Sequence, residues 1–582
     1  MSIDINDMFK DKVLGHPAGL FVLFFTEMWE RFSYYGMRAL LVMFFTASLL
    51  DGGWGWPREH AYAIFGTYTS LVYLSTLVGG YFADKKIGYR YAVVIGALLM
   101  TLGHGAMAVE TPFFIYLGLT LLVFGSGFFK PNMTSIISEM YKGKDEKKDG
   151  AYTIFYMGVN AGAFLGILLC GYLGEQVGWR WGFGLAGIFM LFGLLQFWFA
   201  QNIFGDIGKK PVKVEAAEIE LSADEPKLNP FTSLHLGLIA VAGILGISWI
   251  FNDPISKISE GAYNLFDFSM FGIEGSNLAI LTALGLFVVL LAIRIPKYDR
   301  ITRDRMLAVI FFAFITIFFW AIFEQAPSSL TIFARDYTQR VLEGNAAFMF
   351  KIVNSMMTVI PLGIITWVLW LLFKKTFSKY ALSNIFLAIS FIIIWGIAIW
   401  MLSMEFGKEI AEVPASWFGV LNSLFIIAFA PLFSRWWESK YNPNANMKYA
   451  IGMVLLGVGM ACVAIGASSI EPGAKTASVS MIWLILVYFF HTMGELCISP
   501  VALSYVSKLV PGRMIAMMFG IWYLAIAIGM KLAGVFGEAS EGIAETQGLS
   551  YFFWILTAVA VGLGVFSALF YPIIKKLMHG VR

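Results

Sequence analysis

The stretch Thr26-Glu-Met-Trp-Glu-Arg-Phe-Ser-Tyr-Tyr-Gly-Met-Arg38 puts four charged residues inside an apolar run that extends from about Leu20 to Leu50. A run of this length can cross a bilayer as a helix. Residues three and four apart share a helix face, so the polar residues form one stripe. The stripe consists of Glu27, Glu30, Arg31, Tyr34 and Arg38. Charges at membrane depth usually face a cavity or a substrate path, which predicts a functional interior surface; the alternative is an Arg–Glu pair that only fixes helix packing.

The composition is that of an all-α polytopic membrane protein. Of the 582 residues, 59% are hydrophobic and 14% are charged, whereas soluble domains have about 25% charged residues. The net charge of +3 and the absence of a nucleic-acid-binding motif give no indication of a nucleic-acid partner. The three cysteines lie in apolar runs, which argues against structural disulfides. The polar N-terminus lacks a signal-peptide core, so we expect the first helix to act as its own insertion signal.

Apolar runs of about 20 residues predict sixteen spans, the ninth extending to about Arg335. They begin near Leu20, His60, Tyr91, Phe113, Tyr152, Trp181, His235, Asn277, Met306, Phe348, Ala381, Trp417, Tyr449, Ile482, Met514 and Phe552. Alternate loops hold twenty Lys and Arg residues, and the opposite loops hold about eight. The positive-inside rule therefore predicts an even number of spans with both termini in the cytoplasm.

Several stretches resemble those of a known transporter family. The pattern E-x-x-E-R-F-x-Y-Y-G at residues 27–36 is similar to the first-helix signature of proton-dependent oligopeptide transporters, a branch of the major facilitator superfamily. Residues 125–132 (GSGFFKPN), 155–163 (FYMGVNAGA) and 494–501 (GELCISPV) resemble further blocks of that family, in its fourth, fifth and tenth helices. The resemblance covers most of the chain and implies a major facilitator fold, with two six-helix bundles and additional helices.

The loop between the second and third spans, residues 80–90, also resembles a major facilitator motif. It places Asp84 and Arg90 at the cytoplasmic edge, where charge pairs can act as a conformational latch. The alternative is ordinary anchoring by positive charges.

The resemblance divides the chain into five parts. They are an N-terminal bundle (1–204), a linker with two inter-bundle helices (205–300), the seventh core helix (301–340), an inserted helical hairpin (341–412) and the rest of the C-terminal bundle (413–582). The hairpin departs from the family, in which the seventh helix runs almost directly into the eighth. Its function is open between a lipid-facing brace, an oligomer contact and a partner site.

Intramembrane charges fall on helices one, four, seven and ten, which line the central cavity of this fold. The resemblance implies a proton-coupling set of Glu27, Glu30, Arg31, Lys130 and Glu324. It implies a peptide site of Arg38, Tyr34, Tyr35, Tyr73, Lys130, Asn160, Asn422, Glu495 and Trp522. Opposite charges suit a zwitterion: Arg38 and Lys130 would hold its carboxylate, and Glu495 its amine. For any single tyrosine, simple packing is an equal alternative.

The resemblance implies a proton-coupled symporter that imports di- and tripeptides by alternating access, in the bacterial inner membrane. The expected partners are peptides, peptide-like drugs, protons and membrane lipid, with the proton as coupling ion and no other cofactor. The alternatives are a transporter of the same fold for an amino acid, nitrate or a drug, and a non-transporting sensor. An enzyme is not expected, because the sequence has no evident metal cluster, nucleophile elbow or phosphate loop.

Overall fold

The computed structural model describes residues 10–210, 229–509 and 515–581. Its long helices are α2 (Ala18–Thr46), α3 (Arg58–Phe82), α4 (Tyr89–Met107), α5 (Pro112–Met140), α6 (Asp145–Gln176), α7 (Trp179–Ala200), α8 (Ser233–Ile258), α9 (Gly275–Arg294), α10 (Arg300–Phe323), α12 (Gly344–Thr376), α13 (Ala381–Gly407), α14 (Val420–Glu438), α15 (Ala445–Gly466), α16 (Ile482–Leu509), α17 (Ile515–Thr546) and α18 (Leu549–Leu569). Two short helices are α11 (Ser329–Asp336) and α19 (Tyr571–Leu577).

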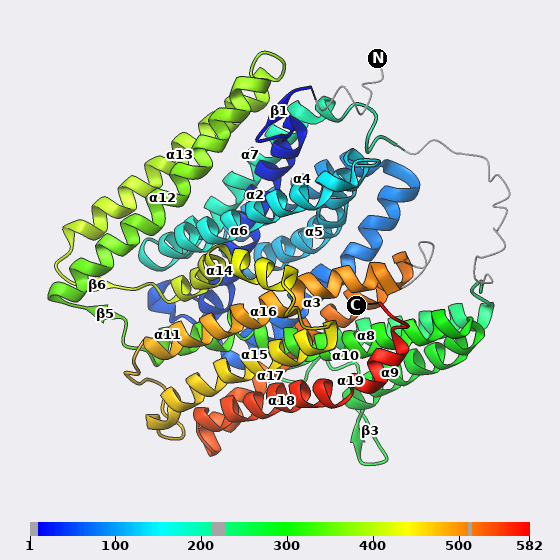
Figure 1. The fold of residues 1–582 in the computed structure, drawn as a ribbon. Coiled ribbons are helices and arrows are strands. Elements are labelled where there is room, and N and C mark those ends of the chain that lie inside the picture. The colour runs from blue at the N-terminus through cyan, green and yellow to red at the C-terminus, as the bar shows by residue number, and fades with distance from the viewer. Residues whose placement is uncertain (1–9, 211–228, 510–514, 582) are drawn as a thin grey trace.

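Three short antiparallel ribbons lie between helices. They are β1 (Lys12–Val13) with β2 (His16–Pro17), β3 (Ser269–Met270) with β4 (Ile273–Glu274), and β5 (Val341–Leu342) with β6 (Ala411–Glu412). The last ribbon closes the hairpin α12–α13, because its two strands flank the two ends of that hairpin (Figure 1).

The helices confirm an integral membrane protein of about sixteen spans. Fifteen helices in the described residues are long and apolar enough to cross a membrane. The sixteenth is α2, whose 29 residues include the four charges of the polar stripe. An apolar span with that many charges is unusual, and it is tolerated where the charged face is buried in protein.

The helices form two bundles, which Figure 1 shows one above the other. In the N-terminal bundle, α2 packs against α6 and α7, and α4 packs against α5 and α7. In the C-terminal bundle, α15 packs against α16 and α18, and α10 packs against α17. We call the side of the molecule where α2 begins and α18 ends the terminal side, and the opposite side, where α2 ends and α3 begins, the distal side.

The seventh core helix is broken, which differs from the single span expected to reach Arg335. The chain leaves the helix after Phe323 and resumes helical structure only at Ser329, as α11. Pro327 explains the break, because proline has no backbone N–H to donate and disfavours helical geometry in the residue before it. The break leaves Glu324 as the first residue beyond α10.

The inserted hairpin packs on the N-terminal bundle, although its sequence interrupts the C-terminal one. Near the terminal side, the Ser383 hydroxyl donates to the carbonyl of Gln196 on α7 at 2.8 Å. At mid-depth the ring of Phe391 lies 5.6 Å from that of Trp29 on α2. Near the distal side, Tyr172 of α6 donates to Glu405 at 2.8 Å. These contacts run the length of α13, so the hairpin forms an outer layer of the N-terminal bundle.

Replacing Phe391 by Ala should destabilise the protein, because Phe391 fills the space between α13 and α2. Its side chain is 4% exposed, whereas that of its neighbour Ile392 is 72% exposed. Truncating a buried Phe typically costs about 3–5 kcal/mol in soluble proteins. Thermal unfolding in detergent should therefore show a clearly lower apparent Tm for Phe391→Ala and little change for the control Ile392→Ala. Equal Tm values for the two variants would contradict this packing.

Candidate functional site

The polar stripe of α2 forms a buried charge cluster. The Arg31 Nε lies 3.0 Å from Glu27 Oε1, and the same guanidinium pairs with Glu30. The exposed fractions are 4% for Glu27, 0% for Glu30 and 3% for Arg31. One cation thus serves two carboxylates, and the second carboxylate oxygen of Glu27 has no hydrogen-bond partner among the described residues. The two carboxylates therefore outnumber the cation that pairs with them.

Aromatic rings hold the neighbouring cations. The Tyr34 ring centroid lies 5.4 Å from the guanidinium carbon of Arg31, 5.4 Å from that of Arg38 and 5.5 Å from the Lys130 Nζ. The Nζ of Lys130 is closer to the ring of Tyr73, at 4.3 Å. A ring face attracts a cation without neutralising its charge. Lys130 has no ion pair with a carboxylate within the described ranges, so it remains able to bind an anion.

Arg38 joins the two bundles. Its Nη1 lies 2.7 Å from the Oε2 of Glu324, beyond the end of α10. The guanidinium also lies 4.8 Å from the ring of Tyr35. The sequence predicts Arg38 in the peptide site and Glu324 in proton coupling, and the structure pairs the two with each other.

Glu495 on α16 has an amide partner instead of a cation. The Asn422 Nδ2 on α14 donates to its Oε2 at 2.9 Å and to the Thr492 hydroxyl at 3.0 Å. Glu495 is 9% exposed, and no ion pair involves it in the part of the chain that the structure describes. Asn422, predicted only as a pocket residue, therefore orients this carboxylate.

The other two predicted residues, Asn160 and Trp522, have no hydrogen bond to these charges among the described residues. The Asn160 amide donates to the backbone carbonyl of Tyr156, one turn earlier on α6, at 2.9 Å. The side chain of Trp522 on α17 is 2% exposed. Tyr68, which the sequence left as a less favoured pocket residue than Tyr73, is also buried, and its hydroxyl lacks a hydrogen-bond partner within the described residues.

The proposed latch residues do not pair with each other. The Arg90 Nε donates to the carbonyl of Ile207 at 2.6 Å, and the guanidinium also reaches the carbonyl of Gly205. Arg90 therefore fastens α4 to the segment after α7, within the N-terminal bundle. Asp84 is exposed, and no ion pair involves it among the described side chains. A sequence motif cannot show which backbone carbonyl a side chain will bind, because every residue has one.

The bundles are held together on the distal side by contacts that the sequence analysis missed. Arg58 at the start of α3 pairs with Asp336 of α11 at 2.8 Å and lies 3.5 Å from Glu541 of α17. The carboxylate of Glu175, near the end of α6, accepts from the backbone N–H groups of Ala415 and Ser416 at 2.7 and 2.9 Å. The residues in these pairs are separated by 240 to 483 positions in the chain, so no local sequence pattern predicts them.

Glycines let the bundles touch on this side. A Cβ added to Gly66 on α3 would lie 2.9 Å from the Cα of Gly534 on α17, so any larger residue would push these helices apart.

Nearer the terminal side, Tyr156 and Met157 on α6 are 43% and 56% exposed. Tyr156 lies one turn before Asn160, on the helix that begins at the terminal side. In the described residues, the polar contacts between bundles thus lie in the distal half.

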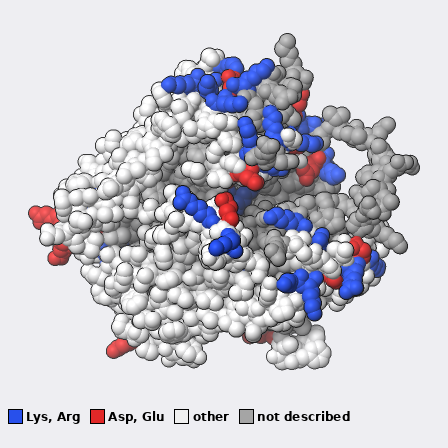
Figure 2. Space-filling view, in the orientation of Figure 1, with Lys and Arg blue, Asp and Glu red and all other residues white. Residues whose placement is uncertain are grey.

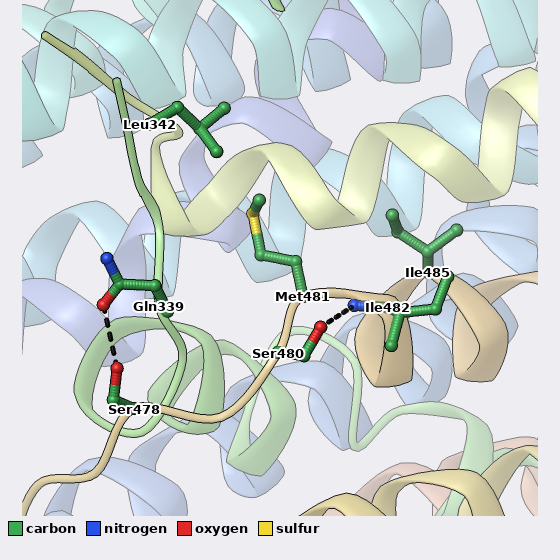
Figure 3. A pocket seen from close by; sticks show the side chains of 7 residues that line it. All are labelled: Gln339, Leu342, Ser478, Ser480, Met481, Ile482 and Ile485. Carbon is green, nitrogen blue, oxygen red and sulfur yellow. Dashed lines mark hydrogen bonds between the residues drawn. The ribbon is translucent and has the colours of Figure 1, made fainter. Parts of the chain in front are cut away.

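A hollow of about 480 Å³ lies on the distal surface and differs from the charged site. Figure 3 shows its lining from the loop before the hairpin and the start of α16, with the Ser478 hydroxyl donating to the side-chain Oε1 of Gln339 at 2.9 Å. The lining residues are Gln339, Leu342, Ser478, Ser480, Met481, Ile482 and Ile485. None is charged, so this hollow offers no partner for the charged ends of a zwitterion. The described residues also contain no group of three His, Cys, Asp or Glu placed to hold a metal ion.

Comparisons with known proteins identify the family. The sequence pattern described as the POT family matches residues 90–219 and 388–554, which make up about half of the chain. A peptide transporter of Yersinia enterocolitica subsp. palearctica is 32% identical over 531 residues, covering 90% of this chain and 88% of the relative. A di-/tripeptide transporter of Lactococcus lactis subsp. cremoris is 28% identical and covers 98% of both chains.

Solved structures agree in fold. A crystal structure of the peptide transporter POT in complex with sulfate superimposes with a TM-score of 0.70 at 28% identity, covering 100% of both chains. Together with the two bundles and the charges on α2, α5 and α16 and just after α10, these matches show that the chain belongs to the POT family of major facilitator transporters.

Proposed function

We propose that this protein is a proton-coupled symporter that imports di- and tripeptides by alternating access. Relatives named as peptide and di-/tripeptide transporters support the substrate class. The observation that carries the proposal is a pair of complementary charges without opposite partners among the described residues: Lys130 on the N-terminal bundle and Glu495 on the C-terminal bundle. A zwitterionic peptide supplies both missing partners, because it has a carboxylate at one end and an ammonium at the other.

Peptide binding would then draw the bundles together. Lys130 and Arg38 offer cationic groups to the carboxylate, and Glu495 offers an acceptor to the amine. Burial of either charged end without its partner would be costly. The tyrosines around the cations add apolar faces and hydroxyl groups, which accept varied side chains without selecting one.

Proton coupling would follow from competition for cations. If the peptide carboxylate binds Arg38, then Glu324 loses its 2.7 Å partner. A buried carboxylate without its cation is costly to keep ionised, so protonation compensates. Glu27 and Glu30 share Arg31 in the same way. Whether both carboxylates stay ionised would depend on whether the Lys130 ammonium lies beside them or beside the peptide. Binding of proton and peptide would thereby be linked.

The charge of the loops supports one orientation of the protein in the membrane. Lys and Arg side chains gather at the top, centre and right of Figure 2, toward the terminal-side loops, whereas the left part of this view is almost uncharged. The positive-inside rule places this side, with both termini, in the cytoplasm. The contacts on the distal side then correspond to a state closed to the outside, in a bacterial inner membrane.

Uptake by the purified protein in proteoliposomes tests the proposal against its alternatives. A labelled dipeptide should accumulate under an inward proton gradient, and an unlabelled dipeptide should compete with it. Accumulation of nitrate or an amino acid instead would favour the same fold with another substrate. Peptide binding without any uptake would favour a sensor.

The variants Glu27→Gln and Glu30→Gln should stop proton-driven accumulation and spare peptide exchange. The amide keeps the shape of the carboxylate but cannot carry a proton. Uptake under a gradient and counterflow without one measure the two activities separately. The exposed Glu59 provides the matched control, since Glu59→Gln removes a carboxylate outside the site. If either site variant still concentrates peptide against its gradient, that residue has no coupling role.

Glu495 should recognise the free amine of the peptide. A buried ion pair broken from one side costs about 3–5 kcal/mol, which corresponds to a factor in Kd of about 10² to 4 × 10³. Acetylating the amine should therefore weaken binding to the unmodified protein strongly. Glu495→Gln should weaken binding of the free peptide and discriminate much less between the two forms. An equal effect of acetylation on both proteins would show that Glu495 does not contact the amine.

A further inference from the structure

A second group of charges, partly to fully buried, lies away from the peptide site, between the inter-bundle helix α8 and α17; its most exposed side chain is that of Lys257, at 34%. Lys531 of α17 pairs with Asp253 of α8, and Lys257 of α8 pairs with Glu538 of α17. Lys257 also lies 2.5 Å from Asp253. The side chain of Lys531 is 2% exposed, and those of Asp253 and Glu538 are 12% and 10% exposed. Two cations and two carboxylates thus balance one another and bind α8 to the C-terminal bundle.

The same group reaches the N-terminal bundle through one hydroxyl. The Lys531 Nζ donates to the Thr67 Oγ1 on α3 at 3.0 Å. The Thr67 hydroxyl in turn donates to the backbone carbonyl of Ile250 on α8 at 3.0 Å. Thr67 therefore connects three helices at one point: α3, α8 and α17.

This point lies where the two bundles are closest. Gly66, the residue before Thr67, faces Gly534 across the α3–α17 contact. When the distal side opens, α3 and α17 must separate here. The helix α8 then cannot keep its bonds to both α3 and α17. It must separate from the helix whose loss costs less free energy.

The chemistry decides which bonds break. Separation of α8 from α17 would leave Lys531 and Glu538 without ion-pair partners, whereas Asp253 and Lys257 remain paired within α8. The loss of partners for two largely buried charges costs far more than the loss of hydrogen bonds between neutral groups. Separation of α8 from α3 loses only the Thr67–Ile250 bond and apolar packing. We therefore expect α8 to remain with the C-terminal bundle and to release α3 each time the distal side opens.

We propose that α8 and α9 form a strap that stabilises the state closed on the distal side. Four charges, Asp253, Lys257, Lys531 and Glu538, fasten the strap to the C-terminal bundle, and Thr67 is the point at which it holds α3. This inference rests on the proposed function in one respect only, that the two bundles alternate between two states. It assigns a conformational role to the inter-bundle helix pair, which the peptide and proton chemistry do not use.

Distances between spin labels test the strap without peptide or a proton gradient. Labels at Glu59→Cys and Gln547→Cys would lie on exposed distal positions beside α3 and α17, with the partly exposed Cys462 changed to Ser. Pulsed electron–electron double resonance in nanodiscs then gives the fraction of molecules in which the two labels are far apart, that is, in which the distal side is open. Thr67→Val keeps the side-chain shape and removes both hydrogen bonds. The ratio of distally open to distally closed molecules should therefore rise about five- to tenfold. The double variant Asp253→Asn with Lys531→Gln, which leaves no lone charge, should shift it in the same direction.

Thr69→Val is the matched control. Thr69 lies on the same helix and is buried, but its hydroxyl donates to the carbonyl of Phe65 in its own helix at 2.8 Å. This control should leave the distance distribution unchanged. The strap is wrong if Thr67→Val and the double variant match the unmodified protein, or if Thr69→Val opens the distal side as much as Thr67→Val. Because no substrate is involved, loss of peptide transport in a separate assay would contradict the proposed function and leave this result standing.

Discussion

A charge buried in a membrane protein must find a partner, and that requirement organises this molecule. Within α2, Arg31 serves Glu27 and Glu30, and Arg38 crosses to Glu324 in the other bundle. Lys130 lies against aromatic rings, which attract a cation without cancelling it. The site is therefore compact yet incomplete, and it has charge left over on both sides. That surplus is what a zwitterionic ligand can use.

The same requirement explains how the bundles are held on one side. Arg58 finds its carboxylates on α11 and α17, and Glu175 finds backbone N–H groups ahead of α14. Each of these contacts spans the two bundles, so each must break when the distal side opens. Small residues also contribute, because Gly66 and Gly534 allow α3 and α17 to approach closely enough for these polar contacts to form.

The two helix pairs added to the core are attached in different ways. The hairpin α12–α13 lies along α2, α6 and α7 through aromatic packing and a few hydrogen bonds, and so it extends one bundle. The pair α8–α9 is bound to α17 by charges and to α3 by a single hydroxyl, and so it bridges both. An addition that belongs to one bundle can move with it, whereas an addition that bridges both must respond to their relative motion.

The sequence by itself determined the span count and the family, and it predicted most charged members of the candidate site. It could do so because the cost of charge in lipid and the helix period are local rules: Glu27, Glu30, Arg31 and Lys130 are conspicuous in apolar runs wherever the chain folds. The tertiary structure decided which charges meet. Arg38 had several carboxylates as possible partners, and only the break at Pro327 and the packing of the bundles bring Glu324 to it, 286 residues away. Likewise, Asn422 reaches Glu495 and Arg90 reaches backbone carbonyls because of how helices pack. The strength of an ion pair or hydrogen bond falls steeply with distance, and these distances are set by the whole fold.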